Sequence, residues 1–148
     1  ADEPAVSAMW ESMADQHARY DGERWDWAED FVDIHRRHLL ETLDSDDFLS
    51  LVAENAGGEV AGYLRASVGE RARIWRVQRQ GLISDMYVAR AHRGRGVGRL
   101  LMERAFEALR ARGAEEVVLR VSEANRSAIS FYEKVGLRLV AHEMYRRL

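Results

Sequence analysis

A glycine-rich stretch at residues 93–99, Arg-Gly-Arg-Gly-Val-Gly-Arg, has the clearest capacity for chemistry in this sequence. It follows a strand-like segment and leads directly into the most regular helical pattern of the chain. The first turn of a helix carries backbone N–H groups without intrahelical partners and about half a positive charge. Glycines let such a backbone approach a ligand closely, and Arg93, Arg95 and Arg99 add charge around it. The stretch therefore predicts a site for an anion such as a pyrophosphate.

Two other nucleotide-binding patterns do not match this stretch. A P-loop needs Gly-x-x-x-x-Gly-Lys-Ser/Thr, which the sequence lacks. A dinucleotide fingerprint needs a third glycine where Arg99 stands, and it belongs near the first strand. A glycine-rich turn that only caps a surface helix is the structural alternative.

Two motifs resemble those of the GCN5-related N-acetyltransferase (GNAT) family. Arg93-x-x-Gly96-x-Gly98, placed after Tyr87-Val88, resembles the acetyl-CoA loop of that family. Asn125-x-x-Ala128-x-x-Phe131-Tyr132-Glu133-Lys134-x-Gly136-Leu137 is similar to its second cofactor motif, with Leu137 where Phe is commoner. The resemblance covers residues 82–148. It implies an α/β (α+β) fold of the acyl-CoA N-acyltransferase type, with a mixed, mostly antiparallel central sheet and helices on both faces.

The resemblance also implies roles for individual residues, with acetyl-CoA as cosubstrate. The backbone of Met86, Tyr87 and Val88 would pair with the pantetheine arm. The pyrophosphate would lie on the loop formed by Arg93, Gly94, Arg95, Gly96, Val97, Gly98 and Arg99. Asn125 would touch the cofactor arm, and Tyr132 would face its sulfur. Positions seven apart share one face of a helix, which agrees with this assignment; a plain helix N-cap at Asn125 and a half-buried core Tyr132 are the structural alternatives.

The implied reaction is direct attack of a neutral amine on the acetyl thioester, with the oxyanion stabilised by the N–H of Val88 or a neighbour. A thiol has a pKa near 8.5 and a tyrosine hydroxyl near 10. Tyr132 is therefore expected to donate a hydrogen bond to the departing sulfur rather than to transfer its proton completely.

The base that accepts the proton of the amine is less well defined by the sequence. Ser84 stands where relatives with a Glu-Asp pair use the glutamate, and a serine is no base at neutral pH. Asp85 is the nearest carboxylate and is the candidate base. Strand alternation predicts that Ser84 and Asp85 point to opposite faces. Pairing of Asp85 with an arginine, and a water relay to an acid on the N-terminal helices, are the alternatives.

The acceptor is predicted to be a cationic small-molecule amine. Asp26, Glu29, Asp30 and Asp33 recur at helical spacing beside Trp25 and Trp27, which suits attraction of a cation. An exposed acidic helix face is the structural alternative. A protein acetyltransferase and a non-catalytic acetyl-CoA sensor are the other functions considered. Nucleic-acid binding is not expected, because no recognition helix or aromatic platform accompanies the arginines of residues 71–99.

Composition sets wider limits on the protein. A chain of 148 residues with 47% hydrophobic and 32% charged residues has room for one domain, residues 1–148. Residues 1–60 carry sixteen acidic and four basic side chains, whereas the remainder carries nine and eighteen. The absence of cysteine excludes a disulfide framework and an enzyme thioester.

No metal site is expected, because His35 and His38 lack a third ligand. We expect a cytoplasmic monomer or homodimer without a membrane span.

Periodicity predicts the elements that must hold these residues. Helices are expected over residues 6–20, 24–43, 97–112 and 125–135, the last two ended by Gly113 and Gly136. Strands are expected over residues 48–53, 60–68, 82–89, 116–121 and 137–145, with a hairpin turn at residues 55–58. The family resemblance also implies a strand ahead of the first helix. None is visible before Val6, so it either precedes the sequence given or the sheet begins later.

Overall fold

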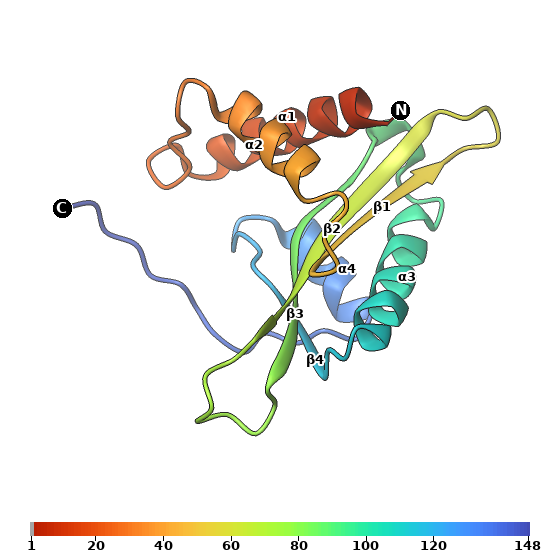
Figure 1. Cartoon of the computed structure of the whole chain (residues 1–148). Helices are drawn as coiled ribbons and strands as arrows, with labels where there is room; N and C mark the ends of the chain where they lie inside the picture. The colour runs from red at the N-terminus through yellow and green to blue at the C-terminus, as the bar shows by residue number, and fades with distance from the viewer. Residues whose placement is uncertain (1) are drawn as a thin grey trace.

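A computed structural model describes residues 2–148 (Figure 1). The elements are, in order, α1 (Glu3–Tyr20), α2 (Phe31–Glu41), β1 (Phe48–Glu54), β2 (Val60–Glu70), β3 (Arg79–Val88), a short 3-10 turn (Arg90–His92), α3 (Val97–Ala111), β4 (Glu116–Leu119) and α4 (Arg126–Lys134). The predicted mixed, mostly antiparallel sheet is confirmed: the strand order is β1-β2-β3-β4, with only the β3–β4 pair parallel.

Helices cover both faces of the sheet, as predicted (Figure 1). Side chains alternate along β2, so Leu64 and Ala66 pack in the cluster with Leu101 and Met102 of α3. Tyr63, which directly precedes Leu64 and points to the other face, packs instead with Trp10 of α1 and Leu39 of α2. The sheet therefore separates two hydrophobic clusters, one beneath α1 and α2 and one beneath α3.

The hairpin between β1 and β2 is also confirmed. Leu51 lies opposite Leu64 in an antiparallel register. In the turn, the Asn55 side-chain oxygen accepts a hydrogen bond from the Gly57 amide at 2.9 Å, and Gly58 has a φ of 77°. Asparagine and glycine at these positions thus form the turn that the sequence predicted.

The predicted helix over residues 24–43 is wrong in its first third. Residues 24–30 form turns, and α2 begins only at Phe31. The Asp21 side chain accepts hydrogen bonds from the Glu23 and Arg24 amides, while the Trp27 indole donates to the Ala14 carbonyl at 3.2 Å. This hydrogen bond to α1 keeps residues 24–30 from forming the first turns of α2.

The predicted strand over residues 137–145 is wrong as well. After Gly136, whose φ is 96°, the chain runs outside the sheet to its end near the α1–α2 connection (Figure 1). We call residues 138–148 the C-terminal segment. No strand precedes α1 in the described range 2–148.

Candidate active site

A large cavity of about 1370 Å³ lies between α1, the second half of β3, the start of α3 and α4. Most of the residues predicted to bind the cofactor line it: Met86, Tyr87, Val88, Arg93, Gly94, Gly96, Gly98, Arg99, Asn125 and Tyr132. The two other members of the predicted set, Arg95 and Val97, do not line it. Residues 86–99 and residues 125–132, which are distant in the sequence, thus line one cavity.

The edge of β3 that faces this cavity is open. β3 pairs with β4 only from Gln80 to Ile83, and β4 ends at Leu119. Beyond this point, Met86, Tyr87 and Val88 pair with β2 alone. Their other edge offers backbone donors and acceptors to the cavity, which is the arrangement that an amide-containing pantetheine arm can pair with.

The glycine-rich loop leads into the start of α3 through two left-handed glycines. Gly94 and Gly96 have φ values of 73° and 84°, a left-handed conformation that favours glycine. Gly96 is the N-cap of α3 and supplies no side-chain hydrogen bond, and the first intrahelical bond of the cap runs from the Leu100 amide to the Gly96 carbonyl. The amides of the first turn are therefore left for a ligand.

Arg93 holds this loop against β3. Its Nε donates to the Val88 carbonyl at 2.9 Å, and its guanidinium lies 5.3 Å from the centre of the Tyr87 ring. Gly98 gives the close packing of the same region, because a Cβ there would lie 3.1 Å from Met86 Cε and 3.3 Å from Phe131 Cζ. These contacts fix the helix start relative to the open strand edge.

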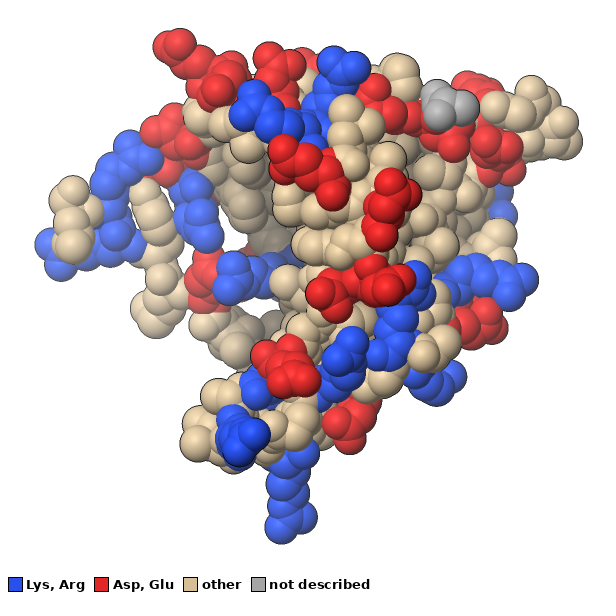
Figure 2. Space-filling view, viewed as in Figure 1, with Lys and Arg blue, Asp and Glu red and all other residues tan. Residues whose placement is uncertain are grey.

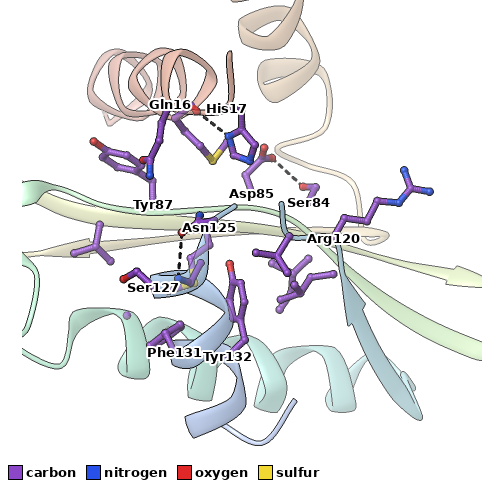
Figure 3. Close-up of a pocket in the computed structure, with 18 of the residues that line it drawn as sticks. Gln16, His17, Ser84, Asp85, Tyr87, Arg120, Asn125, Ser127, Phe131 and Tyr132 are labelled. Atoms are coloured by element: carbon purple, nitrogen blue, oxygen red, sulfur yellow. Dashed lines mark hydrogen bonds between the residues drawn. The ribbon is translucent and has the colours of Figure 1, made fainter. Parts of the chain in front are cut away.

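Asn125 and Tyr132 of the α4 motif both line the cavity (Figure 3). The Asn125 side-chain oxygen accepts a hydrogen bond from the Ala128 amide at 3.2 Å, so the N-cap interpretation is confirmed. The Tyr132 ring packs edge-on against Phe131, with 5.5 Å between ring centres. Burial raises the pKa of Tyr132, so its hydroxyl stays protonated and can act as a donor.

Ser84 and Asp85 do not point to opposite faces, which corrects the prediction from alternation. Arg65 lies opposite Asp85 while Ala66 lies opposite Ile83, so Ser84 is the extra residue of a β-bulge. The bulge lets the Ser84 hydroxyl donate to Asp85 Oδ2 at 2.9 Å (Figure 3). Both side chains line the cavity.

The Asp85 carboxylate has a second fixed partner and a buried cation nearby. The Trp10 indole donates to Asp85 Oδ1 at 3.2 Å, bringing α1 onto β3. Arg65, the cross-strand neighbour, is 4% exposed and donates to Thr42 Oγ1 at 2.6 Å. Burial lowers the pKa of this arginine, and the negative charge of Asp85 opposes that shift. Asp85 thus carries a positioned negative charge at the floor of the cavity.

None of the predicted site residues belongs to the α1 side of the cavity. This wall is mostly aromatic, and its residues are Trp10, Met13, Gln16, His17, Tyr20, Trp25, Trp27 and His35. Trp10, Met13 and His17 recur at helical spacing on α1 and so lie on one side of this helix. This helical spacing was the feature of the sequence from which the cavity wall could have been predicted.

Two histidines of this wall differ in what their ring nitrogens can do. His17 Nδ1 lies 2.8 Å from the Met13 carbonyl, which can only accept, so Nδ1 carries the proton and a neutral ring keeps its lone pair on Nε2. The His35 ring stacks on Trp10 with 3.9 Å between centres. Both of its nitrogens are buried without a partner among the described residues, and burial lowers its pKa.

The predicted acidic stripe lies outside the cavity. Asp26, Glu29, Asp30 and Asp33 are not part of its wall, and the structure brings aromatic rings there in their place. Asp26 pairs instead with Arg147 of the C-terminal segment at 3.0 Å. Figure 2 shows acidic side chains gathered over the region of α1 and α2. Attraction of a cationic acceptor by this surface stays a prediction.

No helix within residues 2–148 is long and apolar enough to cross a bilayer. The same residues contain no group of three or more side chains that could hold a metal ion.

The known proteins to which this chain is similar are acetyltransferases. A family model described as the acetyltransferase (GNAT) family matches residues 8–137. A streptothricin acetyltransferase from Streptomyces lavendulae is 37% identical over 90 residues, which are 61% of this chain and 44% of that protein. An L-methionine sulfoximine/L-methionine sulfone acetyltransferase from Pseudomonas aeruginosa is 31% identical over 117 residues, 76% of this chain and 64% of that protein. The chain therefore spans about half to two thirds of the length of these relatives.

Solved structures share the fold. A mutant of the BH1408 protein from Bacillus halodurans superposes with a TM-score of 0.88 at 21% identity, covering 99% of this chain and 94% of that one. A putative acetyl transferase from Pyrococcus furiosus superposes with a TM-score of 0.75 at 23% identity, covering 98% and 93%.

Proposed function

The chain belongs to the acetyltransferase (GNAT) family, and on this premise we propose that it transfers an acetyl group from acetyl-CoA to the primary amine of a small cationic molecule. The observation that carries the proposal is a single cavity with three parts. It joins the glycine-rich start of α3, the open edge of β3 and a positioned carboxylate. Membership of the family supports acetyl-CoA as the cosubstrate.

Each part of the cavity has a role in this proposal. The pyrophosphate lies on the first-turn amides of α3, beside the charges of Arg93 and Arg99. The pantetheine arm pairs with the free edge of Met86, Tyr87 and Val88, and Asn125 contacts the same arm. This directs the thioester along the groove towards Tyr132 and Asp85.

In the chemical step, the amine nitrogen attacks the thioester carbon, the C–S bond breaks, and the thiolate of CoA leaves. An N–H of Val88 or a neighbour stabilises the oxyanion. Asp85 attracts the incoming ammonium, which loses its first proton to solvent to give the neutral amine, and Asp85 accepts the second proton as the C–N bond forms. Tyr132 donates a hydrogen bond to the leaving sulfur; because burial raises its pKa, complete transfer of its proton is more costly than for an exposed tyrosine.

A cationic acceptor is supported by the walls of the cavity. The Asp85 carboxylate lies in the same cavity as an aromatic wall, and Trp25 of that wall already has the Arg24 guanidinium 5.0 Å from its ring centre, the kind of contact that a cationic acceptor could make. Relatives named for acetylating streptothricin and methionine sulfoximine make a small molecule the preferred acceptor over a protein.

Two measurements on the purified chain test this function. Calorimetry with CoA should give binding, and labelled acetyl-CoA should transfer its acetyl group to members of a panel of diamines, amino acids, aminocyclitols and peptides. Binding without turnover on any amine would instead identify a sensor. Transfer confined to peptides would identify a protein acetyltransferase, and a lack of CoA binding would exclude all three.

A further inference from the structure

His17 presents a free ring nitrogen on the α1 wall of the cavity. Its Nδ1 donates to the Met13 carbonyl at 2.8 Å, so the lone pair of the neutral ring lies on Nε2. Within residues 2–148 no group makes a hydrogen bond to Nε2, and this atom is not one of the buried polar atoms that lack a partner. The side chain lines the cavity and is partly exposed. His17 therefore offers a proton acceptor that can exchange with solvent.

The two other histidines that line the cavity differ from His17. Both ring nitrogens of His35 are buried, and its ring stacks on Trp10. His92 Nε2 lies 3.7 Å from a carboxylate oxygen of Glu59. In the described part of the chain, His17 is thus the cavity histidine whose ring is neither buried nor paired with a carboxylate.

Packing fixes the direction of the His17 ring. The ring lies edge-on to Trp25 with 4.7 Å between ring centres, and to Tyr20 with 5.9 Å. His17 follows two helical turns after Trp10, whose indole is bonded to Asp85. Figure 3 shows the His17 ring, from α1, and the Asp85 carboxylate, from β3, projecting into the same part of the cavity. An imidazole and a carboxylate therefore border one acceptor site.

The proposed reaction removes two protons from the acceptor. A primary alkyl amine is an ammonium ion at neutral pH, and in that form it has no lone pair with which to attack. One proton must leave before the attack and a second as the C–N bond forms. Asp85 is the only carboxylate of the cavity wall within residues 2–148. If it took the first proton, it could not take the second, so the first proton needs another acceptor.

We propose that His17 accepts the first proton of the acceptor ammonium, directly or through one water, an assignment that rests on the proposed function. The N–H bond of the ammonium breaks as the Nε2–H bond forms, which leaves a neutral amine and an imidazolium. The amine attacks the thioester carbon, its second proton passes to Asp85, and the C–S bond breaks to release the thiolate. The partly exposed imidazolium then returns its proton to solvent.

The charges around this part of the cavity are compatible with a proton on His17. Charged and titratable side chains reach it from each element nearby: Tyr20 of α1, Arg24 of the α1–α2 connection, Asp85 of β3, Arg120 after β4 and Tyr132 of α4. The two arginines both pair with Glu143, at 2.7 Å and 3.7 Å, which offsets part of their charge. The carboxylate of Asp85 attracts an imidazolium as it attracts the ammonium.

The variant His17→Gln tests this role, because glutamine is polar but not basic. The probes are the strongest and the weakest base among the panel amines that the natural chain acetylates, beginning with 1,3-diaminopropane and glycinamide. Near pH 7, kcat/KM should fall by about 10²-fold for the strong base and less for the weak one, part of which is already neutral. Near pH 9 both losses should shrink, because solvent then supplies more neutral amine. CoA affinity measured by calorimetry should not change.

His38→Gln is the matched control, because His38 is exposed on α2 and outside the cavity wall, and it should follow the natural chain. Full activity of His17→Gln near pH 7 would overturn the proposal. A loss that is equal for both amines and constant with pH would also overturn it, since a residue that only shapes the wall gives that result. A natural chain that acetylates no amine of the panel would instead contradict the proposed function itself.

Discussion

The Ser84 hydroxyl donates a 2.9 Å hydrogen bond to the carboxylate of its own neighbour, Asp85. Adjacent side chains of a regular strand point to opposite faces, so this contact exists only because Ser84 is the extra residue of the bulge opposite Arg65 and Ala66. The bulge turns Asp85 towards Trp10 on α1, where the second hydrogen bond is made. A carboxylate is thereby held between the α1 wall and the α4 wall of the cavity.

Asp85→Asn should lower kcat/KM for cationic amines by about 10²-fold, because the amide is neutral and cannot accept the proton. Ser84→Ala keeps the carboxylate and loses one hydrogen bond, so its effect should be smaller. Steady-state kinetics over the amine panel measures both. Equal losses of kcat/KM in the two variants would show that the hydrogen bond matters and the charge does not. Asp44→Asn, on the exposed α2–β1 connection, is the control.

Tyr132→Phe should lower kcat by about 10²- to 10⁴-fold while CoA affinity changes little. Since burial raises the pKa of Tyr132, the protonated donor persists as the pH rises, and kcat should show no descending limb from this group between pH 8 and 10. The pH–rate profile is the measurement. A descending limb in that range that disappears in Tyr132→Phe would contradict the role, and Tyr145→Phe, outside the cavity, is the matched control.

Gly96→Ala should weaken CoA binding about tenfold, equivalent to about 1.4 kcal/mol, because an alanine at a φ of 84° strains the start of α3. Gly58→Ala is the control that matches Gly96→Ala in backbone conformation. Its φ is 77°, and neither glycine has any atom within 4 Å of an added Cβ, yet Gly58 lies on the β1–β2 turn. Calorimetry with CoA should separate the two, whereas equal losses of affinity would argue for a global effect of strain.

Gly62→Ala should lower the free energy of unfolding by about 1–3 kcal/mol. A Cβ at this position would lie 2.7 Å from the Tyr87 carbonyl oxygen, which is backbone and cannot move aside cheaply. Gly69→Ala on the same strand meets nothing within 4 Å and should change stability by no more than about 0.5 kcal/mol. Urea unfolding followed by circular dichroism compares them, and similar midpoints would refute the steric argument.

His35→Phe should make stability less sensitive to acid. Burial lowers the folded-state pKa of His35 below its ordinary value of 6.5, so the unfolded chain binds more protons in the range between the two. The free energy of unfolding of the natural chain therefore falls as the pH drops below 6.5. Phenylalanine keeps the stacking on Trp10 without a titrating group. Denaturant unfolding between pH 5 and 7.5 should show the two curves diverging in acid, and His142→Gln should follow the natural chain.

Helix ends and turns that depend only on neighbouring residues could be predicted from the sequence. The glycines at positions 96 and 113 bound α3, and the turn at Asn55 forms as composition indicated. The cofactor motifs at 93–99 and 125–137 meet in one cavity because a parallel β3–β4 pair and two helix starts are encoded by regular patterns.

The features that were predicted wrongly depend on partners distant in the sequence. The bulge at Ser84 requires the register with β2, and residues 24–30 leave the helical path because the Trp27 indole is bonded to α1. The strand predicted for the last residues has the right composition but pairs with no strand within residues 2–148. Periodicity also could not distinguish an aromatic helix face that fills a core from one that lines a cavity, as at Trp10 and His17.

The sheet divides the interior into two clusters that share no buried side chain, one with Trp10 and Leu39 and the other with Leu101 and Met102. Substitutions of buried residues beneath α1 and α2 therefore change no buried side chain of the cluster beneath α3. Under the proposed function, selection in nature or in the laboratory can diversify α1 and α2 for new amines while the helix that binds the acyl donor is inherited unchanged.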